Sequence, residues 1–337
     1  MTLTFPATET TLSAVHLAKL LQERYNLDIQ TSCKLFRTGM NHLYLVTDGG
    51  ARYVLRIYTF NWRSKLDVSE ELRLLRYLQN HDIPVSYPIA DRNGEFIQEI
   101  SALEGVRYGV LLSYAEGKKI PKFNAEISDN IGVTMARIHK LTENFQVSRV
   151  AYDAKSLLED SLKRTQSFFP AGLEEMKFVA GLTEYLIREY GKVNVQEVRR
   201  GVVHLDMWFD NMHFGEDNKI TIFDFDFCGN GWLCLDIAYF IFQLYNTNLD
   251  EAEFKQKAES FLKGYESIQK ISDEERRIIP VVGLCVFLFY LGIQCDRFDT
   301  WSNIFLNEDH LKRFAGSLRR WMVHNNIQLA DINIQAD

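Results

Sequence analysis

The first third of the chain alternates hydrophobic and polar residues over short stretches. Residues 43–47 and 53–57 both alternate around Asp48-Gly49-Gly50, a pattern typical of two strands joined by a glycine turn. Arg92-Asn93-Gly94 marks a second turn, which we expect to have a strand on either side, and residues 108–114 show a further strand pattern. Residues 12–25 and 66–80 instead carry apolar residues at helical spacing. This part is therefore predicted to be a small antiparallel sheet plus helix.

Beyond Gly117 the spacing of hydrophobic residues is mostly helical. Six stretches show it: residues 127–141, 157–168, 173–190, 235–245, 252–268 and 311–323. A strand-like island at residues 202–226 interrupts them and ends in an alternating strand at 220–225. We therefore predict an α+β fold with an N-terminal lobe at residues 1–115 and a helical C-terminal lobe at residues 116–337. A cleft at such a junction is the usual place for a ligand.

Residues 278–295 form an apolar stretch that is interrupted only by Gln294. Its 18 residues reach the lower limit for a membrane span. Ser272 and Glu275 form a capping box just upstream, and Pro280 would kink a helix or open a new one. Because amphipathic segments lie on both sides, we predict a buried helix from residue 272 to residue 295 and no membrane partner.

Composition and charge narrow the classes of partner. Hydrophobic residues make up 46% of the chain and charged residues 25%, which is ordinary for a soluble protein. The net charge of −7 disfavours nucleic acid, which requires a basic surface. The five cysteines are odd in number and form no CxxC pair, and the N-terminus shows no secretory signal pattern. We therefore expect free thiols in a cytoplasmic protein, whose oligomeric state the sequence does not reveal.

Candidate chemistry concentrates at residues 202–240, where acidic residues stand among apolar ones. Such residues are costly there unless they bind a metal or hydrogen-bond partners. Asp206 and Asn211 lie five residues apart, and Asp224 follows 13 residues later, after a turn at residues 216–219. A hairpin across this turn would place Asn211 beside Asp224, and their oxygen atoms suit magnesium. Asp206 would then be free to accept a hydroxyl proton, as phosphoryl transfer requires.

These residues also carry a family resemblance. HLDMWFDN resembles the catalytic loop HxDxxxxN of the aminoglycoside phosphotransferase and choline kinase-like family, and IFDFD resembles its metal-binding strand. The resemblance implies a protein-kinase-like two-lobe fold, ATP and Mg²⁺ as cofactors, Asp206 as the catalytic base, and Asn211 and Asp224 as metal ligands. It also implies that Asp236, in LDIAYF, braces the loop. His204 is interpreted as structural support through its ring nitrogens, and Asp226 as either structural support or a second metal contact.

The likeness continues upstream, over roughly residues 35–245. Gly39-Met40-Asn41 lies where this family has its phosphate-covering loop. Arg56 lies at the position of the phosphate-contacting Lys, and Glu71 at that of the helix Glu that pairs with it. The resemblance therefore implies that nucleotide contacts come from Gly39, Asn41, Arg56, Glu71 and, at the connector that receives adenine, Ser113, Tyr114 and Ala115.

Two positions depart from the family pattern. Leu205 stands where the family commonly has Gly, and Arg56 replaces the more usual Lys but keeps the charge and can grip phosphate oxygens with two nitrogens. These departures motivate one alternative, a pseudokinase-like module that binds nucleotide or metabolite without transfer. A metal-dependent hydrolase that uses His204, Asp206, Asp224 and Asp226 is a second alternative, although it does not explain Arg56.

The phosphate acceptor is expected to be a small hydroxylated molecule. Trp208 lies inside the catalytic loop, where an aromatic face could bind an ammonium group, whereas Trp301 is interpreted as core. Asp210 could approach a cationic substrate, and Asp296 and Asp299 follow the apolar helix. An amine-bearing alcohol fits these side chains, and choline, ethanolamine, homoserine, a sugar derivative or an aminoglycoside remains open.

Overall fold

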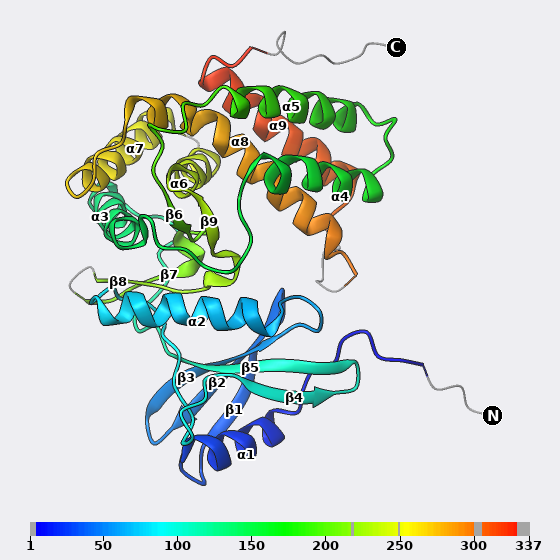
Figure 1. Cartoon of the computed structure of the whole chain (residues 1–337), viewed down its shortest axis with the longest axis vertical. Coiled ribbons are helices and arrows are strands. Elements are labelled where there is room, and N and C mark those ends of the chain that lie inside the picture. The colour runs from blue at the N-terminus through cyan, green and yellow to red at the C-terminus, as the bar shows by residue number, and fades with distance from the viewer. Residues whose placement is uncertain (1–4, 217–218, 249, 300–304, 329–337) are drawn as a thin grey trace. The chain divides into compact units, whose positions relative to one another are not determined.

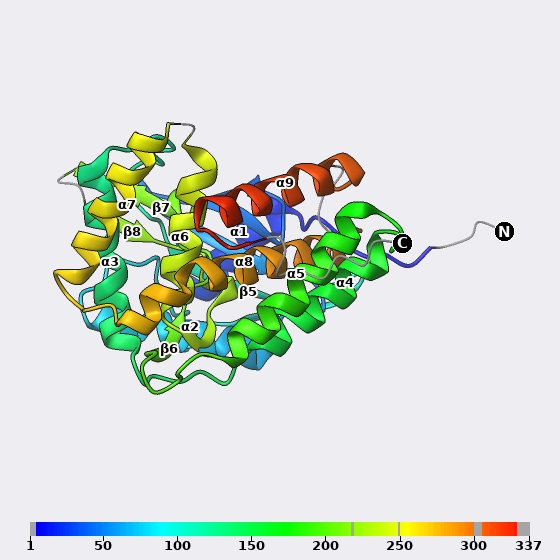
Figure 2. The same ribbon diagram turned by 90° about the horizontal axis from the view of Figure 1, so that it is seen from above.

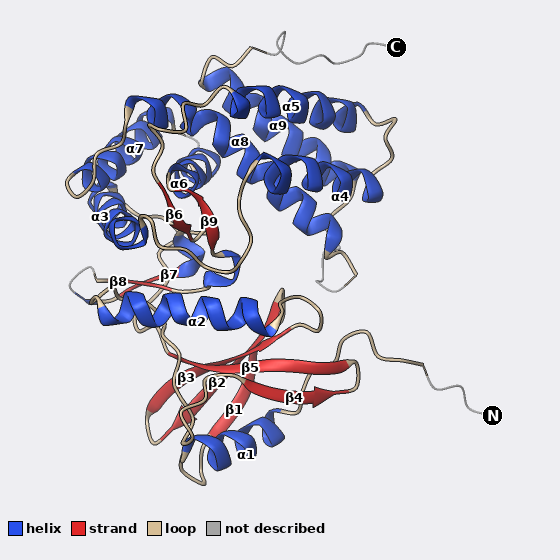
Figure 3. Ribbon diagram, viewed as in Figure 1, coloured by secondary structure: helices blue, strands red, loops and turns tan. Residues whose placement is uncertain are grey.

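The computed structural model describes residues 5–216, 219–248, 250–299 and 305–328. Trp301 and the turn residues Asp217 and Asn218 lie outside the described residues. The chain divides into two compact units, one formed by residues 1–116, with which Asp299 is grouped, and one that begins at Gly117 (Figure 1). The first contains an antiparallel sheet and two helices, and the second is mostly helical (Figure 3). The predicted mixed fold is confirmed.

The sheet of the first unit has five antiparallel strands in the order β1-β2-β3-β5-β4. Their bounds are β1 Ser32–Arg37, β2 Asn41–Asp48, β3 Ala51–Tyr58, β4 Gln98–Ala102 and β5 Gly105–Ser113. The predicted hairpin is confirmed, because Asp48 pairs with Ala51 across Gly49 and Gly50, whose φ angles are 53° and 95°. Such positive φ angles favour glycine.

The prediction of a strand before Arg92-Asn93-Gly94 is wrong. Val85 and Pro88 are isolated bridge residues there, Pro88 opposite Leu112, whereas β4 follows the turn as expected. Two prolines explain this difference, because Pro84 and Pro88 have no backbone N–H to donate to a strand ladder, so the segment joins β5 through the carbonyl of Tyr87 and the N–H of Ile89.

The two faces of this sheet carry different helices. On one face, α1 (Ala14–Tyr25) packs Leu17 and Leu21 against Leu55, Ile57 and their neighbours. Because side chains alternate along a strand, Arg56 points to the other face. There it meets Glu71 of α2 (Lys65–Asn80). The alternation of β3 therefore sends apolar residues into the core and one cation toward α2.

The second unit is built from seven α-helices among the residues described. They are α3 Ala125–Thr142, α4 Asp160–Phe168, α5 Glu174–Gly191, α6 Cys234–Thr247, α7 Glu251–Glu266, α8 Asp273–Asp296 and α9 Glu308–His324. A π-helical turn at Lys155–Glu159 precedes α4, so the predicted helix 157–168 is interrupted at its start. Figure 2 shows α4 and α5 lying side by side. Ten residues of α6 are buried, which makes it the central helix of this unit.

Two short strand pairs lie among these helices. β6 (Arg200–Val203) pairs with β9 (Gly229–Trp232), and β7 (Met212–Phe214) pairs with β8 (Ile220–Ile222). The strand predicted at 220–225 is therefore too long. It ends at Ile222 because Asp224 has a φ angle of 66°, which a strand does not accommodate. Together the two pairs hold the segment between residues 203 and 229.

The apolar stretch belongs to α8, as predicted. This helix begins at a capping box between Ser272 and Glu275 and runs through Pro280 without interruption. Among the described residues it is the one helix long and apolar enough to cross a membrane, but 72% of its most apolar window is buried inside the structure. Its apolar character is thus explained by its position in the protein core.

Candidate active site

The loop between β6 and β7 begins at His204, whose ring holds the loop together. Its Nδ1 accepts a hydrogen bond from the backbone N–H of Asp206 at 3.1 Å, so its Nε2 carries the proton and donates to the carbonyl of Phe223 at 3.1 Å. The side chain is buried, with 2% of its surface exposed. Both ring nitrogens are thereby engaged in structure, which leaves neither as a metal ligand.

Asp236, in the first turn of α6, binds the backbone of this loop. Its Oδ2 accepts from the N–H of His204 at 2.8 Å, and its Oδ1 accepts from the N–H of Leu205 at 2.6 Å. The Nε2 of His139 donates to Oδ2 at 3.0 Å, and Tyr265 in turn contacts His139 Nδ1 at 2.8 Å. The carboxylate is fully buried, so these three donors compensate its desolvation.

Leu205 adopts the backbone conformation that glycine usually supplies. Its φ angle is 66°, in the left-handed region, and its side chain is fully buried. This conformation costs a leucine roughly 1–2 kcal/mol. The hydrogen bond from its N–H to Asp236 and a 3.4 Å contact from the Tyr290 hydroxyl to its carbonyl hold the strained residue in place. The loop therefore keeps its shape despite the departure from glycine.

Asp206 lies partly buried with a donor on each carboxylate oxygen. The Tyr239 hydroxyl donates to Oδ1 at 2.6 Å, and the Asn211 side-chain amide donates to Oδ2 at 2.8 Å. Burial raises the pKa of Asp206 to about 7, and the charge of Asp224 acts in the same direction. Hydrogen bonds from Tyr239, Asn211 and Tyr290 oppose them. A carboxyl group with a pKa in this range is suited to accept a proton near neutral pH.

The β7–β8 hairpin brings Asn211 next to the strand that leads to Asp224. The carbonyl of Asn211 accepts from the N–H of Phe223 at 3.0 Å, one residue before Asp224. This is the hairpin predicted from the turn at residues 216–219. Asn211 is buried, and its amide nitrogen donates both to the carbonyl and to Oδ2 of Asp206, so Oδ1 points away from this contact. Asp226 is also buried, and its carbonyl accepts from Arg149.

The four candidate substrate residues have different surroundings. Trp208 is partly buried and packs against Phe209, with ring centroids 4.1 Å apart. Asp210 forms an ion pair with Lys119 at 2.9 Å, so its charge is already matched within this unit. Asp296 and Asp299 are exposed. Trp208 and Asp210 lie in the loop between β6 and β7.

In the first unit, Arg56 and Glu71 form a buried ion pair. The Arg56 Nη1 donates to Glu71 Oε1 at 2.7 Å, and the Tyr58 hydroxyl donates to Glu71 Oε2 at 3.0 Å. Arg56 is 4% exposed and Glu71 1% exposed. The guanidinium is thus held in one orientation by strand β3 and helix α2.

The predicted phosphate loop and connector are tied into the same unit. The Thr59 hydroxyl donates to the carbonyl of Met40, and the Asn41 side-chain oxygen accepts from the N–H of Thr59 at 3.4 Å, so the segment after Gly39 is fastened to the end of β3. The N–H of Ser113 donates to the carbonyl of Tyr87, and the carbonyl of Ser113 accepts from the Ser86 hydroxyl. Its neighbour Tyr114 lies 4.1 Å below the guanidinium of Arg52, and Ala115 is buried.

Comparison with known proteins identifies the family. The profile of the phosphotransferase enzyme family, APH, matches residues 32–271, which is more than two thirds of the chain. The chain belongs to the phosphotransferase enzyme family. The family resemblance noted in HLDMWFDN and IFDFD is thereby confirmed.

Relatives of this phosphotransferase include named small-molecule kinases. A homoserine kinase of Bradyrhizobium diazoefficiens is 27% identical over 88% of this chain and 88% of its own length. An amicoumacin kinase solved with AMP-PNP, Ca²⁺ and Ami has a TM-score of 0.76 at 22% identity, covering 92% of this chain and 94% of its own. A microcompartment-associated aminopropanol kinase has a TM-score of 0.74 at 18% identity, covering 94% and 99%. The two solved structures share the fold of this phosphotransferase.

Sequence reasoning missed three side chains around Asp206 of this phosphotransferase. Tyr239 contacts Asp206 directly, Gln243 donates to the Tyr239 hydroxyl at 2.9 Å, and Tyr290 stacks on Tyr239 with ring centroids 5.4 Å apart. A signal for the first existed in the sequence, because Tyr239 follows Asp236 by three residues on a helix and therefore shares its face. Tyr290 could not be found in this way, since it lies 84 residues from Asp206.

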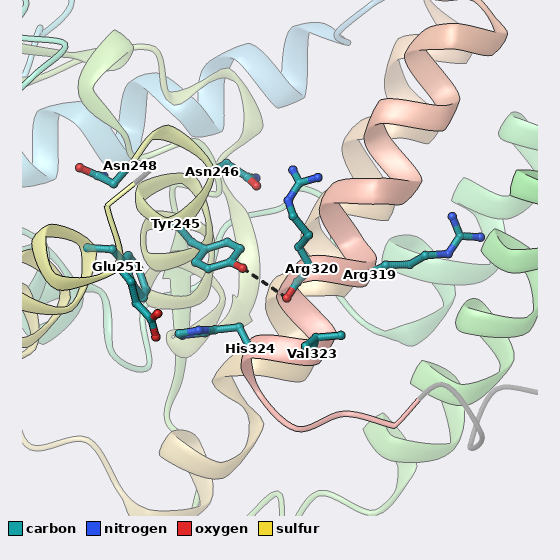
Figure 4. A pocket seen from close by; sticks show the side chains of 9 residues that line it. Tyr245, Asn246, Asn248, Glu251, Arg319, Arg320, Val323 and His324 are labelled. Carbon is teal, nitrogen blue, oxygen red and sulfur yellow. Dashed lines mark hydrogen bonds between the residues drawn. The ribbon is translucent and has the colours of Figure 1, made fainter.

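Two cavities of this phosphotransferase contain none of the predicted site residues. One, of about 690 Å³, is lined by residues of α6, α7, α9 and the segment between the first two, among them Tyr245, Asn246, Glu251, Arg320 and His324 (Figure 4). The other, of about 610 Å³, is lined in part by Tyr152, Tyr190 and Trp232. In Figure 4 the Tyr245 hydroxyl donates to the carbonyl of Arg320 at 3.3 Å. Tyr245 lies on α6, as Tyr239 does, but its hydroxyl contacts Arg320 rather than Asp206.

Proposed function

We propose that this phosphotransferase transfers the γ-phosphoryl group of ATP to a hydroxyl group of a small metabolite, with Asp206 as the base. One observation carries the proposal. Asp206 is partly buried, and each of its oxygens is held by a donor, Tyr239 or Asn211. A base fixed in this way can orient an acceptor hydroxyl and accept its proton as the oxygen attacks phosphorus.

The proposed magnesium ligands are Asn211 and Asp224. The amide nitrogen of Asn211 faces Asp206, so its oxygen is the atom available to a cation. Asp224 lies beside it through the β7–β8 hairpin, and a carboxylate with an amide oxygen matches the preference of magnesium for oxygen ligands. When bound, the metal would neutralise phosphate charge. Asp226, which is buried at the next turn, would support this segment.

The proposed nucleotide contacts come from residues 1–115. Arg56, fixed by Glu71, would contact the α and β phosphates, and the segment from Gly39 to Asn41 would cover them. Tyr114 and Ala115 would contact the adenine, and Ser113, whose backbone bonds to Tyr87 and Ser86, would fix the end of β5. Residues 116–337 would supply the base, the metal ligands and the acceptor site.

The proposed acceptor is an amine-bearing alcohol. Homoserine and aminopropanol, the compounds in the names of two relatives, are small molecules of this kind. Trp208 offers an aromatic face inside the catalytic loop, and Asp296 and Asp299 offer exposed carboxylates. Asp210 is a weaker candidate for holding an amine, since Lys119 already neutralises it.

The five cysteines are free thiols, which supports the proposal of a cytoplasmic location.

The two alternatives lose their main support. Leu205 and Arg56 were reasons to consider a module that binds without transfer. Leu205 takes the left-handed conformation and leaves the hydrogen bond between Asp206 and Asn211 in place. Arg56 keeps its charge beside Glu71. A metal-dependent hydrolase would need His204 as a ligand, whereas both ring nitrogens are hydrogen-bonded. Within the described ranges, no group of three or more His, Cys, Asp or Glu side chains could hold a metal ion.

The proposed function is tested by following ADP formation from ATP and Mg²⁺ with a panel of hydroxylated compounds. The panel contains L-homoserine, 1-amino-2-propanol, ethanolamine, choline and an aminoglycoside, with the matching compounds that lack the hydroxyl group as controls. We expect at least one alcohol to raise ADP formation well above the rate with water alone and to yield its phosphate ester. Equal rates with the alcohols and their deoxy controls would contradict the proposal.

Removal of Glu71 is expected to destabilise the first unit and to weaken nucleotide binding. Glu71→Ala would leave the buried Arg56 guanidinium without its carboxylate, a change that costs about 3–5 kcal/mol when a buried pair is broken. Chemical denaturation measures this loss, and titration with an ATP analogue measures affinity. Glu99→Ala is the matched control, because Glu99 pairs with Lys65, the first residue of α2, while both side chains are more than half exposed, and such pairs contribute at most about 1 kcal/mol. Equal losses for both variants would contradict a special role for Glu71.

A further inference from the structure

Tyr239 and Gln243 form a short hydrogen-bond chain that ends on the proposed base. Both residues lie on α6, four positions apart, and therefore on one face of the helix. The Gln243 side-chain nitrogen lies 2.9 Å from the Tyr239 hydroxyl, and that hydroxyl lies 2.6 Å from Oδ1 of Asp206. Tyr239 is 4% exposed, so water has little access to compete for these bonds.

The chemistry of the three groups fixes the direction of each bond. An ionised carboxylate can only accept, so the single proton of the Tyr239 hydroxyl must go to Asp206. The hydroxyl oxygen must then accept from Gln243, which can donate only through its amide nitrogen. Burial and the charge of Asp206 also raise the pKa of Tyr239 well above its usual range, so the proton stays on the tyrosine. Gln243 thereby orients the hydroxyl, and the hydroxyl orients the carboxylate.

The second oxygen of the base is fixed from another element. Asn211 donates to Oδ2 from the short helical turn Phe209–Asn211, which precedes β7. With one donor on each oxygen, the plane of the carboxylate cannot rotate without losing a charge-assisted hydrogen bond. The ring of Tyr239 has a separate support, because it stacks on Tyr290 and lies near Phe287. Removing the hydroxyl alone should therefore spare the packing of the ring.

We propose that Tyr239, oriented by Gln243, is a positioning residue that holds the carboxylate of Asp206 in the orientation for accepting the proton of the substrate hydroxyl. This inference rests on the proposed function of Asp206 and adds two residues to it. Such a residue acts on the catalytic step rather than on nucleotide binding, since a misplacement of about 1 Å at a reacting group can cost roughly 10²-fold in rate.

The kinetic test compares Tyr239→Phe, Gln243→Leu and the double variant with the wild-type protein. The assay uses ATP, Mg²⁺ and the most active alcohol of the panel described above. We expect Tyr239→Phe to lower kcat by about 10- to 100-fold while the KM for ATP changes less than about twofold. Gln243→Leu should lower kcat less, and the double variant should match Tyr239→Phe, because Gln243 acts through the tyrosine hydroxyl.

Tyr245→Phe is the matched control. Tyr245 lies on the same helix and loses the same atom, but its hydroxyl bonds to the carbonyl of Arg320 rather than to Asp206 (Figure 4). The kcat of the Tyr245→Phe variant should stay within about twofold of the wild-type value. A kcat for Tyr239→Phe within the same limit would overturn the inference. A double variant whose loss equals the product of the two single losses would overturn the role given to Gln243.

A second readout does not depend on turnover. Thermal unfolding of Tyr239→Phe, Asp206→Asn and their combination measures whether the two side chains are coupled. We expect Tyr239→Phe to lower Tm by about 2–4 °C in the wild-type background and by less than half of that in the Asp206→Asn background, because the charge-assisted bond is then already gone. Equal shifts in both backgrounds would contradict the contact. Transfer activity in Asp206→Asn would instead contradict the proposed base, so the two failures are distinguishable.

Discussion

Asp206→Asn is expected to lower kcat by roughly 10²- to 10⁴-fold, the contribution of a general base, while leaving nucleotide binding and folding intact. The side chain keeps its shape but loses its ability to accept a proton. An asparagine can turn its oxygen toward the amide of Asn211 and its nitrogen toward the Tyr239 oxygen. The hydroxyl proton of Tyr239 then loses its acceptor, so we expect a modest loss of stability in a variant that still folds. ADP formation measures the rate, and titration with an ATP analogue and magnesium measures binding.

The matched control for this prediction is Asp160→Asn. Asp160 begins α4, and its carboxylate pairs with Lys155 and Lys163 on the surface. Surface ion pairs of this kind contribute at most about 1 kcal/mol, so this variant should transfer phosphate at the wild-type rate. Wild-type turnover by Asp206→Asn would show that Asp206 is not the base. A loss of ATP binding in that variant would show that its role is not confined to the chemical step.

Asp236→Asn is expected to destabilise the protein by about 2–4 kcal/mol and to lower its activity as well. Asp236 is fully buried and receives three donors: the backbone N–H groups of His204 and Leu205 and the ring of His139. An asparagine has only one acceptor oxygen, so its amide group must face a donor. Because Leu205 is held in a strained conformation by one of these bonds, the catalytic loop should lose its shape.

Chemical denaturation measures the loss of stability in Asp236→Asn, with Asp250→Asn as the matched control. Asp250 caps the N-terminus of α7 through a bond from the N–H of Glu253, and asparagine is an equally good residue at such a position. The control should therefore change stability by less than about 0.5 kcal/mol. If Asp236→Asn showed a change as small as the control and kept full activity, the carboxylate would not be what braces the loop.

Much of the fold of the N-terminal unit could be predicted from the sequence, because the relevant signals are local. The glycine turn at Gly49 and Gly50, the alternation of β3 and the helical spacing of α2 each depend on neighbouring residues. The pairing of Arg56 with Glu71 could be placed by resemblance, but its burial required the structure. The strand expected before Arg92 does not form because Pro84 and Pro88 cannot donate a backbone N–H to a strand ladder.

In the second unit, the hairpin between Asn211 and Asp224 could be predicted from the sequence, whereas the strands that hold this segment could not. The spacing of Asp206, Asn211 and Asp224 predicted a hairpin, and the structure forms it. The pairing of β6 with β9 was not predicted, since each strand has only four residues and little pattern of its own. The length of the strand before Asp224 was overestimated because a left-handed residue cannot be recognised from hydrophobic alternation.

The sequence by itself determined the fold class, most of the helices and the three residues proposed for chemistry, because these depend on short-range periodicity and on motif spacing. Tertiary structure decided which groups surround Asp206. Tyr239, Gln243, Tyr290 and His139 reach the loop from helices α3, α6 and α8, which are distant along the chain. The physical reason is that buried hydrogen bonds are made between side chains brought together by packing, and no local pattern records such a meeting.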